Sequence, residues 1–143
     1  MSYPALFDSD AGAGGYVVTF PDFGYGVTQG ETVEEATRMA EDLLKCTIMD
    51  FIAEDKNLPK PSAPRGRKYR QVSLPALQAA KVALYVAFRQ AGIRKSELAR
   101  RTRISKTNID RLFDLDHASR LDQIESAFRA LGKKLVVDVQ NAA

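Results

Sequence analysis

The stretch KSELARRTRISKTNIDRLFD, residues 95–114, decides how the C-terminal half of this 143-residue chain folds. Its aliphatic residues recur at a spacing that lets two short helices, joined by a turn, share one core. They are Leu98, Ile104, Ile109 and Leu112. Ala99 is small enough for the second helix to cross closely over the first. The pattern predicts a helix-turn-helix, a motif that inserts its second helix into the major groove of DNA.

The polar residues of the second predicted helix would lie on the face opposite to this core. An amide such as that of Asn108 can pair with adenine, and a guanidinium such as that of Arg111 with guanine or phosphate. Arginines of the first helix and the turn would contact phosphates or form a solvated face. The predicted DNA-binding residues are Ser105, Lys106, Thr107, Asn108, Arg111, Arg100, Arg101 and Arg103.

Three residues depart from the usual pattern of the motif. Arg103 occupies the turn, where glycine adopts a left-handed backbone most easily, and Thr102 replaces an aliphatic residue just before it. Arg94 stands where Ser or Thr would cap the first helix. The motif therefore predicts DNA binding but leaves its strength open.

The two halves of the chain carry opposite net charge. Residues 1–63 hold four Lys/Arg against eleven Asp/Glu, a net charge of −7, whereas residues 64–143 hold 17 Lys/Arg against seven Asp/Glu, a net charge of +10. A basic half attracts phosphate and an acidic half repels it. The acidic half would suit a basic protein as partner, although a helix face rich in Glu is often only solvated.

A proline-rich connector separates the two halves. Three prolines within residues 57–70 prevent helix and central-strand formation and keep the chain extended. The sequence therefore predicts two domains. The first covers residues 1–74, including this connector, and the second covers residues 75–143.

The N-terminal half predicts a small antiparallel sheet covered by one helix. Thr32 and Glu35 form a capping box, and apolar residues recur at helical spacing after it for about six turns. The predicted strands cover residues 3–8, 16–20 and 24–28, with a glycine-rich turn at 11–15 and a candidate fourth strand at 69–74.

The C-terminal half predicts an all-α domain with one terminal strand, so the fold class is α+β. A helix runs from Pro75 to Ala91, and Ser119 with Asp122 starts another after the helix-turn-helix. The apolar face of the first of these helices is predicted to hold Ala79, Val82, Ala83, Val86 and Ala87. Residues 134–139 form a β-branched segment without a sheet of its own. We expect this strand to pair with a second copy, giving a homodimer or tetramer.

The sequence also bears on the compartment. It holds no run of about 18 apolar residues and no basic leader followed by an apolar stretch. We expect a cytoplasmic protein without a membrane partner. Its single cysteine, Cys46, lies among apolar residues and is predicted to be a buried thiol.

Four segments carry a resemblance to a known family. They are GYVVTFPDF at residues 15–23, TQGETVEEATRMAEDLL at 28–44, LARRTRISKTNIDRLFD at 98–114 and LDQIESAFRALGKKL at 121–135. Their order resembles HicB antitoxins with a C-terminal helix-turn-helix of the Cro/phage-repressor type. The resemblance implies a partial ribonuclease-H-like N-terminal domain. It also implies a HicA toxin partner, a small basic RNA-cleaving protein, and repression of the antitoxin's own operon through operator DNA.

Given that partner, the turn at Pro21-Asp22 is the simplest inhibitory surface of the acidic half. It lies between two predicted strands, where a carboxylate could face the cationic groups of a basic active site. The predicted toxin-binding residues are Asp22, Phe23 and Tyr25. The alternative role of Asp22 is to hydrogen-bond the backbone of its own turn.

Two other functions remain open. A ribonuclease-H-like nuclease would need carboxylates that converge on metal ions, and the candidates do not converge obviously. These candidates are Asp8, Asp10, Asp22, Glu34, Glu35, Glu41 and Asp42. We therefore expect no enzyme activity, metal or cofactor. A one-component repressor with a ligand-sensing N-terminal domain is the other alternative.

Overall fold

The structure, a computed structural model, describes residues 1–9 and 14–142. The chain divides into two compact units, residues 1–79 and residues 80–143. Within the described residues the fold is a mixed α+β arrangement of a four-stranded antiparallel sheet and five helices. The α+β fold class predicted from the sequence is thereby confirmed at this level.

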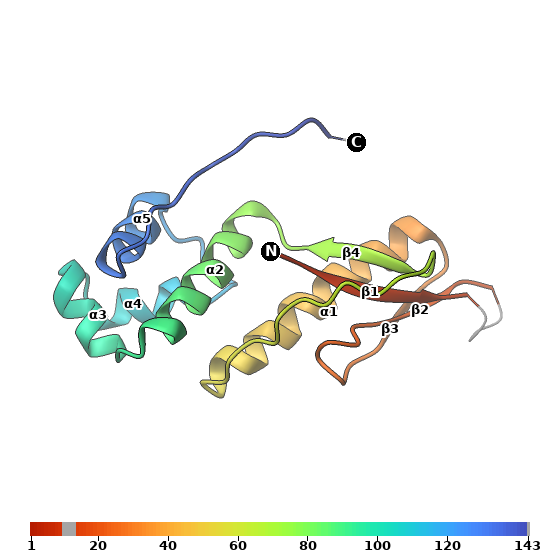
Figure 1. The fold of residues 1–143 in the computed structure, drawn as a ribbon, viewed down its shortest axis with the longest axis horizontal. Helices are drawn as coiled ribbons and strands as arrows, with labels where there is room; N and C mark the ends of the chain where they lie inside the picture. Colours follow the sequence, from red (N-terminus) through yellow and green to blue (C-terminus); the bar gives the residue numbers. More distant parts are fainter. Residues whose placement is uncertain (10–13, 143) are drawn as a thin grey trace. The chain divides into compact units, whose positions relative to one another are not determined.

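The sheet belongs entirely to the first unit and has the strand order β3-β2-β1-β4 (Figure 1). Its strands are β1 (Ser2–Asp8), β2 (Tyr16–Thr19), β3 (Thr28–Gly30) and β4 (Tyr69–Ser73). Each neighbouring pair is antiparallel, with Leu6 opposite Thr19 and Tyr3 opposite Val72. The candidate fourth strand is therefore real, and it pairs with the first strand of the chain.

The third strand lies later than predicted. The sequence predicted a strand at 24–28, but β3 is Thr28–Gly30. Gly24 and Gly26 have φ values of 75° and 87°, which no strand residue adopts, so the chain forms an irregular loop before it can pair with β2. The predicted turn at 11–15 lies partly outside the described residues.

One long helix, α1 (Val33–Ala53), packs along one face of the sheet. The Thr32 hydroxyl caps it by accepting a hydrogen bond of 3.1 Å from the Glu35 N–H, as the capping box predicted. Ala36, Ala40, Leu44 and Ile48 are its buried apolar residues. Cys46 is exposed, so the prediction of a buried thiol was wrong. It lies two positions, about 200°, after the buried Leu44, which turns it away from the sheet.

The connector between α1 and β4 is fixed to the first unit. The Tyr3 hydroxyl donates a 2.7 Å hydrogen bond to the Pro59 carbonyl. Further along, the Ser62 N–H donates to the Asp22 carboxylate over 2.9 Å. The prolines keep this segment out of helix and strand, and these bonds hold it in place.

The second unit contains the remaining helices. They are α2 (Ala76–Ala91), α3 (Lys95–Thr102), α4 (Lys106–Leu112) and α5 (Leu121–Ala130), and the first residues of α2 still belong to the first unit. The predicted apolar face of α2 was only partly right, because Ala79, Ala83 and Val86 are half-buried. Its fully buried residues include Lys81, Leu84, Tyr85 and Phe88. The buried face is therefore rotated and includes a charged residue.

The end of the chain differs most from the prediction. Residues 133–142 form neither helix nor strand in the single chain (Figure 1), so the predicted strand at 134–139 is not present there. A strand needs hydrogen-bond partners for its backbone groups, and the sheet of the described residues, β3-β2-β1-β4, does not include this segment. Val136, Val137 and Val139 are more than two-thirds exposed. The start of α5 also differs from the prediction. Arg120, not Ser119, is its N-cap residue, and no side chain caps the helix.

Candidate functional site

Two short helices and the turn between them form the first candidate site. Helices α3 and α4 pack against each other, and Leu98 of α3 and Ile109 and Leu112 of α4 have no exposed surface. Ile104 in the turn is half-buried. The shared core expected from the sequence is therefore present, and it fixes which face of α4 stays free.

The turn itself has a left-handed backbone at a non-glycine residue. Arg103 has φ 58° and ψ 22°, in the region where an L side chain costs about 1–2 kcal/mol. Thr102 stabilises this turn, because its hydroxyl donates to the Leu98 carbonyl over 2.8 Å and accepts from the Ile104 N–H over 3.2 Å. The two unusual residues of the motif thus act together. Arg94 provides no side-chain cap for α3.

The free face of α4 is polar and cationic. Ser105 caps the helix by accepting a 3.2 Å hydrogen bond from the Asn108 N–H. Lys106, Thr107 and Arg111 are exposed, and Asn108 is half-buried. The Arg111 guanidinium donates to the Asn108 amide oxygen over 3.4 Å, a long contact that a stronger acceptor can displace.

Both arginines of α3 form ion pairs with Glu97 of the same helix. Glu97 accepts hydrogen bonds from the Nε atoms of Arg100 and Arg101, each over 3.0 Å. These bonds, Arg100 first, hold the pKa of Glu97 below its usual value. Both guanidinium charges are therefore partly compensated, and Arg103, in the turn after α3, is exposed. An outside anion would therefore compete with Glu97 for Arg100 and Arg101.

The three predicted toxin-binding residues lie in the loop after β2 and differ in their exposure to solvent. Phe23 is only 7% exposed and packs against Tyr3 and Phe51, with ring centroids 4.7 and 5.4 Å apart. Tyr25 is 49% exposed and stacks on Phe51. Asp22 is half-buried and holds the connector. Tyr25 therefore offers the most surface to a partner.

Two carboxylates, Asp50 and Glu54, lie near this exposed tyrosine, together with Lys56, which is ion-paired with Glu54. Desolvation, then Asp50 and Glu54, raise the pKa of the Tyr25 hydroxyl, and Lys56 partly opposes them. Val27, two residues further, is 64% exposed. An apolar and aromatic surface beside carboxylates is suited to a cationic partner with apolar side chains.

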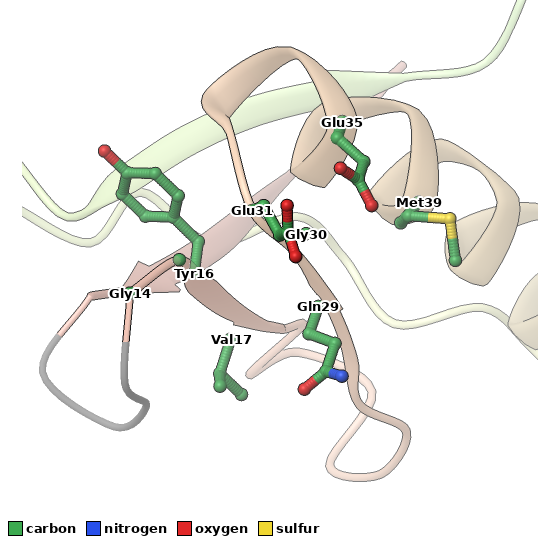
Figure 2. A pocket seen from close by; sticks show the side chains of 9 residues that line it. Gly14, Tyr16, Val17, Gln29, Gly30, Glu31, Glu35 and Met39 are labelled. Carbon is green, nitrogen blue, oxygen red and sulfur yellow. The ribbon is translucent and has the colours of Figure 1, made fainter.

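A shallow pocket of about 470 Å³ opens at the other end of β3 (Figure 2). The start of β2, the end of β3 and the start of α1 line it. Its lining residues are Gly14, Gly15, Tyr16, Val17, Gln29, Gly30, Glu31, Glu35 and Met39. Figure 2 shows the carboxylates of Glu31 and Glu35 on the side formed by the start of α1. The pocket therefore combines acidic, amide and apolar groups.

The carboxylates that the structure describes were candidates for a metal centre. Within residues 1–9 and 14–142, no group of three or more His, Cys, Asp or Glu side chains could hold a metal ion. Asp10, one of the candidates for a nuclease site, lies outside these residues. Over the same part of the chain, no helix combines the length and apolar character that crossing a membrane requires.

Comparison with known proteins identifies the family. Residues 2–83 match the family model described as the HicB_like antitoxin of bacterial toxin-antitoxin system. The chain is 42% identical over 135 residues to Antitoxin HicB of Escherichia coli (strain K12), covering 94% of this chain and 96% of that protein. The chain belongs to the HicB-like antitoxin family. It is thus an antitoxin of a toxin-antitoxin system, as the resemblance implied.

Other HicB antitoxins are similar over the same length. Antitoxin HicB 1 of Photorhabdus laumondii is 34% identical over 140 residues, covering 98% of this chain and 88% of that protein. A solved toxin-antitoxin complex from Streptococcus pneumoniae contains a chain 30% identical to this antitoxin, with a TM-score of 0.44. That similarity covers 60% of this chain and 72% of the other.

One buried residue of the antitoxin was not predicted from its sequence. Lys81 is fully buried in α2, although lysine is rarely buried. The sequence does contain a signal for its burial, because the neighbours of Lys81 in the predicted helix, Val82, Leu84 and Tyr85, are apolar or aromatic. A lysine in such surroundings indicates a specific partner for its charge.

Proposed function

We propose that this HicB-like antitoxin neutralises a HicA-like mRNA-cleaving toxin through its first unit and represses its own operon by binding operator DNA through α3 and α4. The proteins would act in the cytoplasm, where the mRNA and the operon are found. The first unit would mask the toxin, and the second would carry the complex to DNA.

The observation that carries the DNA-binding proposal is the split between the two faces of α4. Ile109 and Leu112 are completely buried, so the opposite face, with Lys106, Thr107 and Arg111, is available to a ligand. These side chains have the chemistry that base edges and phosphates require. With the left-handed turn before α4, the arrangement supports a helix-turn-helix that reads a major groove.

The toxin-binding proposal is supported by charge and by exposed apolar surface. Residues 1–63 carry a net charge of −7, which attracts a basic ribonuclease. Tyr25 and Val27 offer apolar contact area in the same unit, and Glu31 and Glu35 in the pocket offer acceptors for basic side chains. Aromatic anchors surrounded by complementary charge are typical of tight protein interfaces.

The C-terminal tail supports a proposal about assembly. Val136, Val137 and Val139 are exposed in the single chain and have the β-branched side chains that favour strands. Pairing of two tails across a two-fold axis would bury them and satisfy their backbone groups. A homodimer or tetramer built in this way would present two copies of α4 to a palindromic operator, about 34 Å apart.

The test uses the full-length antitoxin and its neighbouring gene. We expect the adjacent reading frame to encode a small basic protein that is toxic alone, is neutralised on co-expression and co-purifies with the antitoxin through one tag. We also expect the antitoxin to bind the duplex upstream of the operon more tightly than a scrambled duplex of equal length. Failure to co-purify would contradict the toxin partner, and equal affinity for both duplexes would contradict operator binding.

The pocket favours one alternative, a repressor whose first unit senses a small ligand. Its lining of Gln29, Glu31 and Glu35 could bind a small cationic molecule. The same experiment distinguishes the two functions. A ligand-sensing repressor would bind operator DNA more tightly than the scrambled duplex, but it would not co-purify with the product of the adjacent reading frame.

A further inference from the structure

Lys81 of α2 places a buried ammonium among three backbone carbonyls. The side chain has no exposed surface. Its Nζ donates to the Arg111 carbonyl over 2.9 Å, to the Asp114 carbonyl over 2.6 Å and also to the His117 carbonyl. Three acceptors match the three N–H groups of a protonated lysine, whereas a neutral amine has only two. The site is therefore built for a cation.

The electrostatics of this site have two opposing parts. Burial lowers the pKa of Lys81, because charge is poorly solvated in the protein interior, and the nearby Asp114 carboxylate opposes that effect. The three carbonyl dipoles and the C-terminal end of α4 also favour the ammonium. The charge is thus compensated by the elements that it holds.

Those elements are the end of α4 and the loop that follows it. Arg111 lies in the last turn of α4, where carbonyls have no partner within the helix. Its carbonyl accepts from Lys81, from the Asp114 N–H over 3.2 Å and from the Ser119 hydroxyl over 3.3 Å. Lys81 therefore closes this end of the helix and folds the loop back onto it.

The same face of α2 holds this region by packing. Lys81, Tyr85 and Phe88 are spaced four and three residues apart, on one side of the helix. The Phe113 ring, directly after α4, lies 6.0 Å from the Tyr85 ring and 4.9 Å from the Phe88 ring. The ion pair of Asp110 in α4 with Lys95 is partly exposed to solvent and adds little rigidity. The buried end of α4 is thus its fixed end.

We propose that Lys81 is a positioning residue for DNA recognition: its buried ammonium sets the orientation of α4 toward the bases. The inference rests on the proposed DNA binding of α4. Arg111 links the two functions directly, because its carbonyl is bound by Lys81 while its side chain belongs to the exposed face. A shift of that carbonyl moves the guanidinium, and Asn108 one turn earlier moves with it. Base contacts depend on such geometry far more than phosphate contacts do.

Replacing Lys81 by Met tests this role in the full-length chain. Methionine has a similar length but no donor, so it keeps the packing and removes the three hydrogen bonds. The measurement is the dissociation constant for the upstream operator and for a scrambled duplex, each over a range of salt concentrations. We expect the ratio of the two constants to fall about tenfold, because one well-placed base contact contributes that much discrimination. The salt dependence should stay unchanged, since the phosphate contacts remain.

Val82→Ala is the matched control. Val82 is the buried neighbour of Lys81 and donates no hydrogen bond to α4, so its truncation destabilises the same unit without touching the three carbonyls. The control should keep the wild-type ratio at a temperature where both variants are folded. Backbone amide exchange at residues 113–117 should be faster in Lys81→Met than in Val82→Ala, even without DNA.

The outcomes are separable. A wild-type chain without preference for the operator would contradict the proposed function, whereas a preference that survives in Lys81→Met would overturn only the role of Lys81. Equal amide exchange in the Met variant and the control would overturn it as well. If Lys81→Met does not fold, Lys81→Gln retains two donors, and we expect its ratio to fall about threefold, the effect of one lost hydrogen bond. An unchanged ratio in that variant overturns the inference.

Discussion

The Asp22 carboxylate accepts a hydrogen bond from the backbone N–H of Ser62, 2.9 Å away and forty positions further along the chain. The carboxylate therefore bridges from the loop after β2 to the proline-rich connector, rather than closing its own turn. A charged residue used in this way has a structural role that its charge alone does not reveal.

Two substitutions separate this structural role from a role in toxin binding. Asp22→Ala removes the acceptor and should lower the free energy of unfolding by about 1 kcal/mol, whereas Asp22→Asn keeps an acceptor and should change it little. Urea denaturation followed by circular dichroism measures both. Equal stability of the Ala and Asn variants would show that the bond to Ser62 contributes nothing.

The same Asn variant tests the charge. If Asp22 faces a basic toxin, Asp22→Asn should weaken the complex, and the loss should shrink as salt is raised, because ions screen exposed charges beyond about 10 Å at 0.1 M. Affinity measured by titration calorimetry at two salt concentrations gives the result. A loss that is independent of salt would point to shape rather than charge.

Gly30 determines how closely α1 can approach the sheet. A Cβ atom there would lie 2.7 Å from the Ala36 Cα, well inside contact distance and against backbone that cannot rotate away. We expect Gly30→Ala to destabilise the first unit by at least about 2 kcal/mol. Gly24→Ala is the control, since its φ is 75° but no atom lies within 4 Å. It should cost about 1 kcal/mol, from backbone strain alone. Similar losses in both would refute the steric explanation.

The buried Tyr3 gives the stability of the first unit a pH dependence. Burial, then the Asp22 charge, raise its pKa from 10.0 to about 12. Between these values the unfolded chain has lost the proton that the folded chain keeps, so the free energy of unfolding falls as pH rises. The fall should total about 2–3 kcal/mol by pH 12. Denaturation of wild type and Tyr3→Phe at pH 9 to 12 measures it, and parallel curves for the two proteins would contradict it.

The polar face of α4 yields a prediction about DNA. Asn108→Ala and Arg111→Ala should each weaken operator binding by about 1–3 kcal/mol, because each removes a candidate base contact. Arg120→Ala is the control, since Arg120 is exposed and pairs with Asp122 outside α4. Fluorescence anisotropy with the upstream duplex measures all three. Unchanged binding in the first two variants would mean that another surface reads the operator.

The turn residue Arg103 should behave differently. Arg103→Gly relieves the left-handed backbone and should raise the free energy of unfolding by up to about 1 kcal/mol. It should also weaken binding to every duplex and lower the salt slope by about one, as expected for a lost phosphate contact. A variant that changes specificity instead would place Arg103 at the bases.

The exposed tail gives the prediction about assembly. Deleting residues 134–143 removes the segment that would pair across the dyad, so the antitoxin should sediment as a smaller species and lose affinity for a palindromic operator. Toxin binding should persist, because the first unit is intact. Sedimentation velocity with the same duplex measures the first two effects, and an unchanged oligomer would assign another use to the tail.

Local signals in the sequence were sufficient for most elements. Thr32 with Glu35 marked the start of α1, and the spacing of Leu98, Ile109 and Leu112 gave the shared core of α3 and α4, because caps and apolar periodicity act over a few residues. The predicted position of β3 was wrong because Gly24 and Gly26 have positive φ. Glycine can adopt either sign of φ, and the tertiary fold determines which one it takes.

The candidate sites depended more on long-range contacts. Phe23 reads as a loop aromatic, yet it belongs to the core formed with Tyr3 and Phe51. The apolar neighbours of Lys81 show that its charge needs a partner, but the three acceptors lie 30 to 36 positions away and are backbone atoms, which carry no sequence signature. The partial compensation of Arg100 and Arg101 by Glu97 could have been inferred from their helical spacing.

The pairing of β1 with β4 also determines when the sheet can be completed during synthesis. Chains emerge from the ribosome N-terminus first, but β1 has neighbours on both sides only after residues 69–73 have been synthesised. Until then one edge of β1 is open, and an open edge is a template for pairing with other chains. A premature stop within the connector therefore yields an aggregation-prone fragment rather than a small inhibitor. A stop after residue 79 leaves β1 paired on both sides.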